Sequence, residues 1–240
     1  TIRATDNGSP ALDGTGTITV AVTDTAAPFI WTNPAGGAWP DGGNWFEGMV
    51  AAGQNQVADF STLDLTDHAT VSLDGARSIG SLWFGDITPS HDWTLVTGSG
   101  DPLTLTTSVA SPVIHVANRG VTLDAVISGT QGFTKTGEGT LTLGKANSLT
   151  GNVVINRGTV RATHNIALGT SAIVIGDLST GASDLAWLFI NGGSTANALT
   201  VTPNGSGNVT IGTLTGGTFA SLSGAMTLNR PVVLHDGTGD

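Results

Sequence analysis

The stretch GEGTLTLGKANSLTGNVVINRGTVRA, residues 137–162, decides the fold. Its threonine, valine, leucine and isoleucine residues alternate with polar ones in short runs, which is the period of a half-buried β-strand. Glycine or asparagine follows nearly every run, and both residue types accept the positive φ that sharp corners require. The runs are shorter than the strands that hairpins join in sandwiches and barrels. The pattern therefore predicts short strands stacked in successive coils, which is a parallel β-helix or solenoid.

The composition of the whole chain indicates an all-β protein. Of the 240 residues, 39% are hydrophobic, so a sizeable core can form, and 35 are glycine. Only 11% are charged, against roughly 25% in an ordinary soluble domain. Lysine and glutamate, which favour exposed helices, are nearly missing, whereas β-branched residues are abundant. We therefore expect almost no helix.

A longer segment around the opening stretch, FTKTGEGTLTLGKANSLTGNVVINRGTVRATHNIALG, resembles the passenger-associated repeat of bacterial autotransporter-type surface proteins. Leu149 stands where that repeat usually has an aromatic residue. The resemblance implies a right-handed β-helix on the outer surface of a Gram-negative-type cell. The positions that match the repeat are Lys135, Gly137, Gly139, Thr140, Leu141, Leu143, Asn147, Gly151, Ile155 and Gly158.

The chain divides into three sections by composition. Residues 1–28 form two alternating runs around a turn-rich loop, so we expect a terminal β-hairpin. Residues 29–112 are rich in tryptophan and should form an N-terminal cap and the first coils. Residues 113–240 should form further coils, truncated at the end of the chain, which we interpret as a piece of a longer exported protein. Within this section, the segments 116–129 and 224–239 are alike, and each carries Asn-Arg between two expected strands.

The hairpin section also resembles a known family. ATDNGSPALDGTGTITVAVTDTAAPF is similar to the last two strands of a cadherin-type domain, with Ala4, Asp6, Gly8 and Pro10 matching its turn and Asp24 its first linker acid. By resemblance, Asp6 and Asp24 would be Ca²⁺ ligands. Otherwise the sequence predicts no cofactor.

Five of the six tryptophans lie in the section 29–112 and allow two interpretations. Trp31, Trp39 and Trp45 could form a row of exposed rings that stack on sugars. Alternatively, the rings plug the open end of the elongated core, because a repeat fold needs an end unit that covers bare apolar surface. We favour the cap. The five tryptophans are Trp31, Trp39, Trp45, Trp83 and Trp93.

Candidate catalytic groups are few, although many polysaccharide lyases and hydrolases are β-helices. The best cluster is DFSTLDLTDH, which contains Asp59, Asp64, Asp67 and His68, and a solvated turn explains it as well as acid–base chemistry does. The two glutamates, Glu47 and Glu138, lie in glycine-rich loops. The histidines show no metal-binding spacing, although a β-helix can stack distant residues: they are His68, His91, His115, His164 and His235. We therefore assign no catalytic, cofactor-binding or metal-binding residue.

The charge pattern limits the partners. The net charge is −10, and the eight lysines and arginines form no patch, which argues against nucleic acid. No apolar run is long enough to span a membrane, so we expect no membrane insertion. The absence of cysteine is compatible with bacterial export.

The sequence favours a non-catalytic, extracellular structural fragment that serves as a rigid stalk, filament subunit or adhesin shaft. The strands of residues 1–28 could add to the sheet of a neighbouring subunit and give head-to-tail polymers. The alternative is a β-helix that binds or degrades a surface polysaccharide. An exposed row of Trp31, Trp39 and Trp45 beside Asp59 to Asp67 would favour that alternative.

Overall fold

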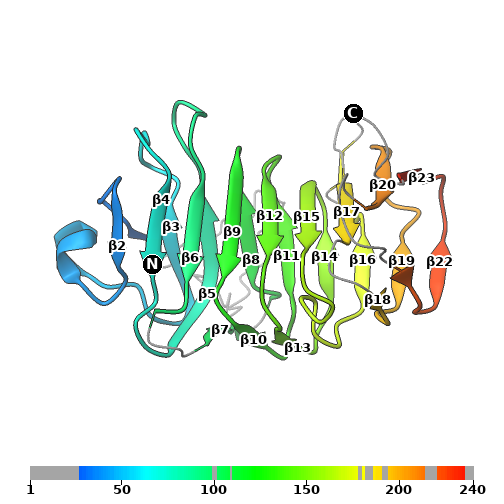
Figure 1. Ribbon diagram of the computed structural model, residues 1–240, viewed down its shortest axis with the longest axis horizontal. Helices are drawn as coiled ribbons and strands as arrows, with labels where there is room; N and C mark the ends of the chain where they lie inside the picture. Colours follow the sequence, from blue (N-terminus) through cyan, green and yellow to red (C-terminus); the bar gives the residue numbers. More distant parts are fainter. Residues whose placement is uncertain are drawn as a thin grey trace, which may run out of the picture.

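Short strands separated by sharp corners stack from one coil to the next in the computed structural model, which describes residues 27–98, 102–108, 110–177, 180–181, 186–190, 194–213 and 221–235. Figure 1 shows the resulting elongated solenoid, with β2 (Gly36–Ala38) near one end and β22 (Met226–Leu228) at the other. The expected all-β, parallel solenoid is confirmed. The expected cadherin-like hairpin, with Asp6 and Asp24, falls almost wholly on residues 1–26, outside the described part of the chain.

One long face of the solenoid is a nine-stranded parallel sheet. Neighbouring strands pair without register shifts, as in Leu123↔Leu143↔Ala162. In spatial order its strands are β2, β4 (Ala69–Ser72), β6 (Trp93–Val96), β9 (Gly120–Asp124), β12 (Thr140–Leu143), β15 (Gly158–Ala162), β17 (Ala186–Ile190), β20 (Val209–Gly212) and β23 (Val233–His235).

The opposite face belongs to a twelve-stranded sheet. Its main column contains β1 (Phe29–Ile30), β3 (Gly53–Phe60), β5 (Arg77–Phe84), β8 (Val113–Val116), β11 (Phe133–Thr136), β14 (Val153–Ile155), β16 (Ile173–Ile175), β19 (Leu199–Val201) and β22. The first half of β5 pairs instead with β7 (Leu103–Leu105), which continues through β10 (Ile127–Gly129) to β13 (Ser148–Leu149) as a third side along the bottom of Figure 1.

The remaining elements are small. A two-stranded sheet joins β18 (Ser194–Thr195) and β21 (Ser221–Leu222), and two 3₁₀ helices, η1 (Gly42–Asn44) and η2 (Phe46–Gly48), lie at the β2 end. No α-helix occurs in the described residues, as the composition predicts, and none of their helices is long and apolar enough to cross a membrane.

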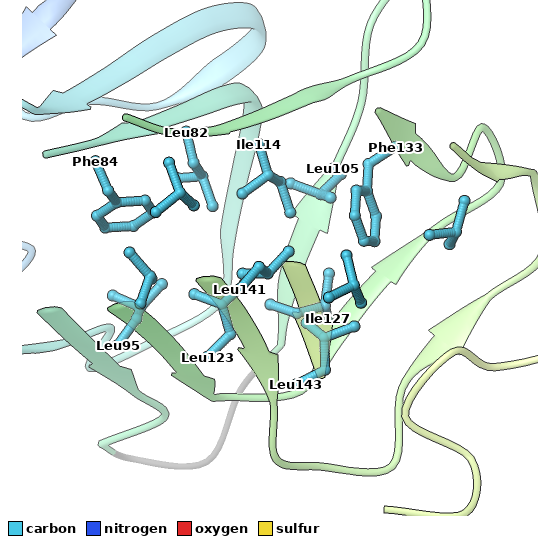
Figure 2. Close-up of a cluster of buried hydrophobic side chains, with 14 of the residues drawn as sticks. Leu82, Phe84, Leu95, Leu105, Ile114, Leu123, Ile127, Phe133, Leu141 and Leu143 are labelled. Carbon is cyan, nitrogen blue, oxygen red and sulfur yellow. The ribbon is translucent and has the colours of Figure 1, made fainter. Parts of the chain in front are cut away.

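The core is a continuous column of inward-facing aliphatic and aromatic side chains. Along the nine-stranded sheet, Leu141, Val160 and Leu188 follow one another in register and are fully buried. Figure 2 shows Leu95, Leu123 and Leu141 of this sheet facing side chains of the twelve-stranded sheet. Each rung therefore buries its apolar side chains between the rungs on either side, and burial of this area is the main stabilising term.

Glycines stand at the corners for two different physical reasons. Gly137 has φ of +77°, and a Cβ there would lie 2.1 Å from the carbonyl oxygen of Val116, so both backbone conformation and space require glycine. Gly151 is not in the left-handed region, but a Cβ would lie 2.2 Å from the carbonyl carbon of Gln131 in the preceding coil. The expectation of positive φ thus holds for Gly137, whereas close approach of a neighbouring coil explains Gly151.

The two similar segments of the last section occupy equivalent corners. Asn118 and Arg119 lie between β8 and β9, and Asn229 and Arg230 lie between β22 and β23. The sequence 156–157 repeats the same pair between β14 and β15. The sheets run continuously across residue 112, because β5 pairs with β8, and the division at residues 28 and 112 stays a prediction.

Candidate functional site

The tryptophans near the β2 end form a buried cap and not an exposed row. Trp31, Trp39 and Trp45 are 0–2% exposed. Their ring centroids lie 5.4–5.6 Å from that of Phe60, which stacks on Phe84 at 4.9 Å. Such offset and edge-to-face aromatic contacts add stability beyond their buried area. This burial agrees with the predicted cap, and it excludes a sugar-binding platform at these three rings.

Each indole of the cap also has its N–H satisfied by a backbone carbonyl. The Nε1 atom of Trp31 donates to Asn33 at 2.6 Å, that of Trp39 to Ala51 at 2.9 Å, and that of Trp45 to Trp39 at 2.7 Å. A buried indole N–H without a partner would destabilise the end of the core. The hydrogen bonds therefore fix the rings where they close the column.

The acidic side chains of residues 59–68 accept hydrogen bonds from backbone N–H groups. Asp59 is buried and accepts hydrogen bonds from the backbone N–H and the hydroxyl of Ser61. Asp64 accepts from the N–H of Thr88, and Asp67 from that of His68. The contacts of Asp59 and Asp67 are the turn-stabilising kind that short acidic side chains make, as the turn interpretation predicts, although Asp59 is buried. Asp64 instead joins its loop to the next coil.

Stacking brings two histidines together that are distant in sequence. The rings of His68 and His91 lie 5.4 Å apart. The Nδ1 atom of His68 lies 3.0 Å from the backbone N of Asp92 and 3.7 Å from its Oδ2. Within the described parts of the chain, no group of three or more histidine, cysteine or acidic side chains is placed to hold a metal ion.

The other histidines lie apart from this pair. His115 faces Thr136 and Trp83, and burial followed by the charge of Lys135 lowers its pKa below the ordinary value. His164 accepts from the backbone of Ile166, and His235 packs against Phe189.

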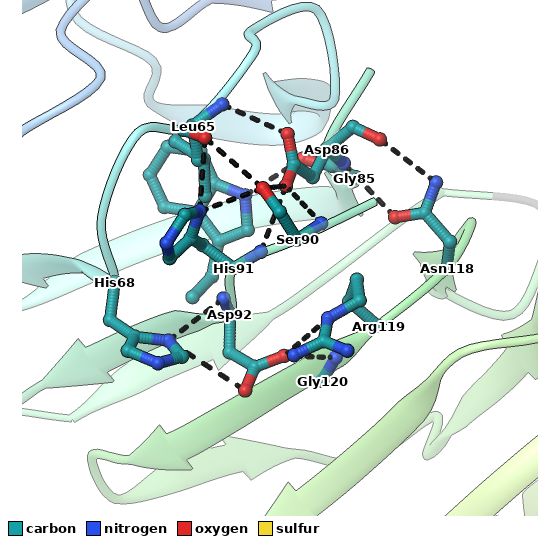
Figure 3. A network of polar contacts seen from close by, with 11 residues as sticks. Leu65, His68, Gly85, Asp86, Ser90, His91, Asp92, Asn118, Arg119 and Gly120 are labelled. Carbon is teal, nitrogen blue, oxygen red and sulfur yellow. Dashed lines mark hydrogen bonds and ion pairs between the residues drawn. The ribbon is translucent and has the colours of Figure 1, made fainter. Parts of the chain in front are cut away.

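A polar network around Asp86 is the most connected set of side chains near His68 and His91, as Figure 3 shows. The Asp86 carboxylate accepts hydrogen bonds from the backbone N–H groups of Leu65, Ser90 and His91 and from the Ser90 hydroxyl, at 2.9–3.1 Å. Burial opposes ionisation, but these donors outweigh it and lower the pKa of Asp86 to about 2. The network ties the loop after β5 to the preceding coil, and Asn118 extends it to the next coil through the Asp86 backbone.

Sequence reasoning missed Asp86. Its only signal was an aspartate directly after an expected strand and before a Pro-Ser turn, a common capping position. Because the Leu65 donor lies in the preceding coil, the full set of donors depends on coil stacking and could not be read from local sequence.

The lysine of the repeat motif lies inside the column. Lys135 is completely buried, and its Nζ donates to the carbonyl oxygens of Thr136, Gly137 and Arg157 at 2.8–3.1 Å. Burial, with a smaller contribution from the Arg157 charge, lowers its pKa to about 7. The ammonium group therefore satisfies the carbonyls of a sharp corner and links two coils.

The asparagine of the motif acts similarly. Asn147 is buried, its Oδ1 accepts from the N–H of Ile127 at 2.8 Å, and its Nδ2 donates to the carbonyl of Ala167 at 2.7 Å. Its side chain thus bridges three successive coils at a corner where the strand ladder is interrupted. Both polar motif residues serve the scaffold, because a buried backbone group without a partner destabilises the fold.

The outer face of the nine-stranded sheet carries rows of threonine and a groove of about 400 Å³. The inner strands of this face are all paired on both sides, so only side chains are offered to solvent. Asp92 accepts from the Gly120 N–H at 2.8 Å and lies 3.4 Å from Arg119 Nε, as Figure 3 shows. The groove is lined by Asp92, Arg119, Gly120, Thr122, Thr140, Thr142 and Arg161.

Comparison with known proteins identifies the repeat on this solenoid. Residues 133–162 match the model of the family described as Passenger-associated-transport-repeat. Over 208 residues, or 87% of its length, the chain is 28% identical to the Adhesin BmaC autotransporter of Brucella suis biovar 1 (strain 1330). The chain spans only 6% of the length of that relative. No solved structure matches the chain.

Proposed function

We propose that the chain is a segment of an autotransporter-type passenger on the outer surface of a Gram-negative-type cell, where it serves as a rigid, non-catalytic shaft of an adhesin. The observation that carries this proposal is the passenger-associated transport repeat within an unbroken parallel solenoid. The likeness to a protein named an adhesin autotransporter supports it. A right-handed path of the coils, which parallel crossovers nearly always take, belongs to the same proposal.

The rigid role follows from how each rung is held. Strand ladders run from β2 to β23 on one face and from β3 to β22 on the other, and a common core lies between them. Bending the column would open inter-strand hydrogen bonds on one face and compress close-packed side chains on the other. The acidic cluster and the Asp86 network are occupied with backbone groups, which favours a scaffold over a hydrolase.

Rigidity can be measured directly because the chain has no cysteine. Spin labels placed by the double substitution Thr70→Cys and Thr200→Cys lie on β4 and β19, which are far apart along the column. We expect a narrow distance distribution by pulsed electron resonance, similar in width to that of a shorter pair four rungs apart on the nine-stranded sheet, Thr70→Cys with Thr159→Cys, whose strands lie roughly 19 Å apart. A distribution several times broader than that control would contradict a rigid shaft.

Surface display has a separate test. Antibodies raised against the purified chain should label intact, unpermeabilised cells of the source bacterium. Labelling that requires permeabilisation would exclude the proposed location. Incubation with uronate-containing and neutral polysaccharides should release no reducing ends, and measurable release would overturn the non-catalytic assignment.

Head-to-tail association through the strands of residues 1–28 is also a proposal. It is supported by the strand pattern alone, since two strands by themselves are only marginally stable. Sedimentation should show concentration-dependent polymers for the full chain and none after deletion of residues 1–25. Unchanged polymers after the deletion would remove this part of the proposal.

A further inference from the structure

The lining of the groove on the outer face of the nine-stranded sheet includes a glycine, Gly120, which has no side chain. Gly120, Thr140, Thr159 and Trp187 follow one another in register along β9, β12, β15 and β17. Gly120 is the first residue of this row. The backbone at Gly120 is not left-handed, so its conformation does not require glycine. A Cβ there would lie 3.2 Å from Asp92 Oδ1, so Asp92 would have to shift by a few tenths of an ångström.

The second row of the groove contains an unusual cation. Arg161 follows Thr122 and Thr142 in register, and it lines the groove together with them. Arg119 has Asp92 as an ion-pair partner, whereas Arg161 has no hydrogen-bonding or ion-pair partner in the described part of the chain, and its Nε is buried and unsatisfied. Arg161 as a whole is half-buried, so its terminal nitrogens are not enclosed with the Nε, and a buried Nε without a partner is costly.

The other described cations all have partners. Lys145 and Arg157 pair with carboxylates, and Lys135, Arg77 and Arg230 donate to backbone carbonyls. Arg161 is thus the described cation that remains available, and it lies in the groove. A guanidinium in this state is suited to bind a carboxylate from outside the chain.

We propose that this groove binds a carboxylate-bearing saccharide, with Arg161 as the principal anchor of the carboxylate and Arg119 as a secondary one. The threonine hydroxyls of Thr122, Thr140 and Thr142 both donate and accept, so they match sugar hydroxyl groups. This site differs from the tryptophan and aspartate residues that the sequence suggested for sugar binding. The inference goes beyond the proposed shaft, and its failure would leave the shaft untouched.

An acidic peptide is the less suitable occupant. Peptides that bind to sheets usually add a strand at an open edge, and β9, β12 and β15 have neighbours on both sides. The groove can therefore offer a peptide no backbone ladder. Its hydroxyl-rich lining and single free guanidinium instead fit a ligand that carries both hydroxyl groups and isolated negative charges.

Calorimetric titration of the full chain tests the proposal with three probes: tetragalacturonate, neutral cellotetraose and tetraglutamate. We expect binding of tetragalacturonate that weakens with salt. Cellotetraose should bind at least about tenfold more weakly, because it lacks the carboxylate and loses a charged hydrogen bond. Tetraglutamate should also bind at least about tenfold more weakly, because it keeps the carboxylates but lacks the hydroxyl groups that the threonines match. Equal binding of cellotetraose or tetraglutamate, or no binding of tetragalacturonate, would overturn the proposal.

Variants locate the site. Arg161→Gln should weaken tetragalacturonate binding about tenfold or more, and Arg119→Gln less, since Asp92 already offsets its charge. Gly120→Thr should fill the hollow and weaken binding. Its circular dichroism spectrum should match that of the unsubstituted chain. Lys145→Gln removes the same charge from an exposed side chain outside the groove lining and should leave binding unchanged. An equal loss in Lys145→Gln and Arg161→Gln would show that only general charge attraction is measured.

Discussion

The two ends of the described column are built from similar rungs but end differently. Near β2, three tryptophans close the core and are almost completely buried. At the other end, β22 and β23 continue the inward ladders, yet Leu228 is 46% and Leu234 is 73% exposed. Leu234 lies directly after Ile211 on its ladder, and Ile211 is 3% exposed. The same type of side chain at the same position is thus buried or exposed according to whether a further layer covers it.

This difference shows what a single rung can and cannot do. A rung has no interior of its own, because its inward side chains are covered only by the adjacent rungs. Aliphatic side chains suffice in the middle of the column, whereas an end requires large rings with satisfied N–H groups. The capped end should therefore contribute a large share of the stability per residue, and the β23 end a small one.

The largest expected effect comes from opening the cap. Phe60→Ala should lower the free energy of unfolding by about 5 kcal/mol, the upper end of the range for such substitutions, because this ring contacts the three cap tryptophans as well as Phe84 and Trp93. Urea unfolding followed by tryptophan fluorescence measures the change.

The matched control for Phe60→Ala is Trp83→Ala, which removes a larger ring from the surface. Trp83 is 38% exposed and lies outside the cap, so we expect a loss of about 2 kcal/mol, less than half of that for Phe60→Ala. Equal losses for the two variants would mean that the cap is no more important than an ordinary surface ring.

The middle of the column can be probed through Lys135. Its pKa of about 7 in the folded chain lies below the ordinary 10.5, so between these values the unfolded chain binds more protons than the folded chain. The free energy of unfolding should therefore rise with pH across this window, by roughly 4 kcal/mol, and stay flat below pH 7 with respect to this group. Urea unfolding at a series of pH values measures the slope.

No tyrosine or cysteine titrates in this pH window, because the chain contains neither residue type. The other lysine, Lys145, is partly exposed and ion-paired at the surface. Lys135→Met should abolish the rise between pH 7 and 10.5, whereas Lys145→Met should keep it. A rise that persists in Lys135→Met would show that the buried ammonium is not its source.

Much of this middle region could be predicted from sequence. Strand alternation and corner glycines in residues 137–162 predict parallel coils, because the inward ladder and the corner conformations depend on local chemistry. The motif identifies Lys135 and Asn147 as special positions, but their tasks could not be read from it. Both side chains bind carbonyls of neighbouring coils, and those partners are about 20 residues away in sequence.

The candidate groove was harder to predict from the sequence, because its residues also meet only through coil stacking. Asp92, Gly120, Thr140 and Arg161 come from different coils, and nothing in the sequence sets the stacking register that brings them together. The tryptophan cap could be predicted from the sequence, since clustered large rings beside a repeat predict an end unit. The aspartates of residues 59–67 formed a dense cluster in sequence but accept from backbone N–H groups: Asp59 and Asp67 from residues one or two positions away, and Asp64 from Thr88 in the next coil.

A smaller effect tests the stretch next to the cap. The pKa of Asp86 is about 2, below its ordinary 3.8, so its contribution is complete above pH 3.8 and is lost as the pH falls towards 2. We expect about 2 kcal/mol of acid-induced destabilisation from this group, and Asp86→Asn should remove that part of the slope. Asp64→Asn, at a carboxylate with one backbone donor, is the control and should change the acid limb less.

The smallest effect belongs to the exposed end. Leu234→Ser should change the free energy of unfolding by less than about 0.5 kcal/mol, because most of the leucine side chain is already in water. Ile211→Ser, one rung earlier on the same ladder, should cost about 3 kcal/mol or more, since it places a hydroxyl in the packed core. Thermal unfolding of the two variants gives the ratio. If Leu234→Ser costs as much as Ile211→Ser, Leu234 is covered in solution, and the contrast between the two ends would disappear.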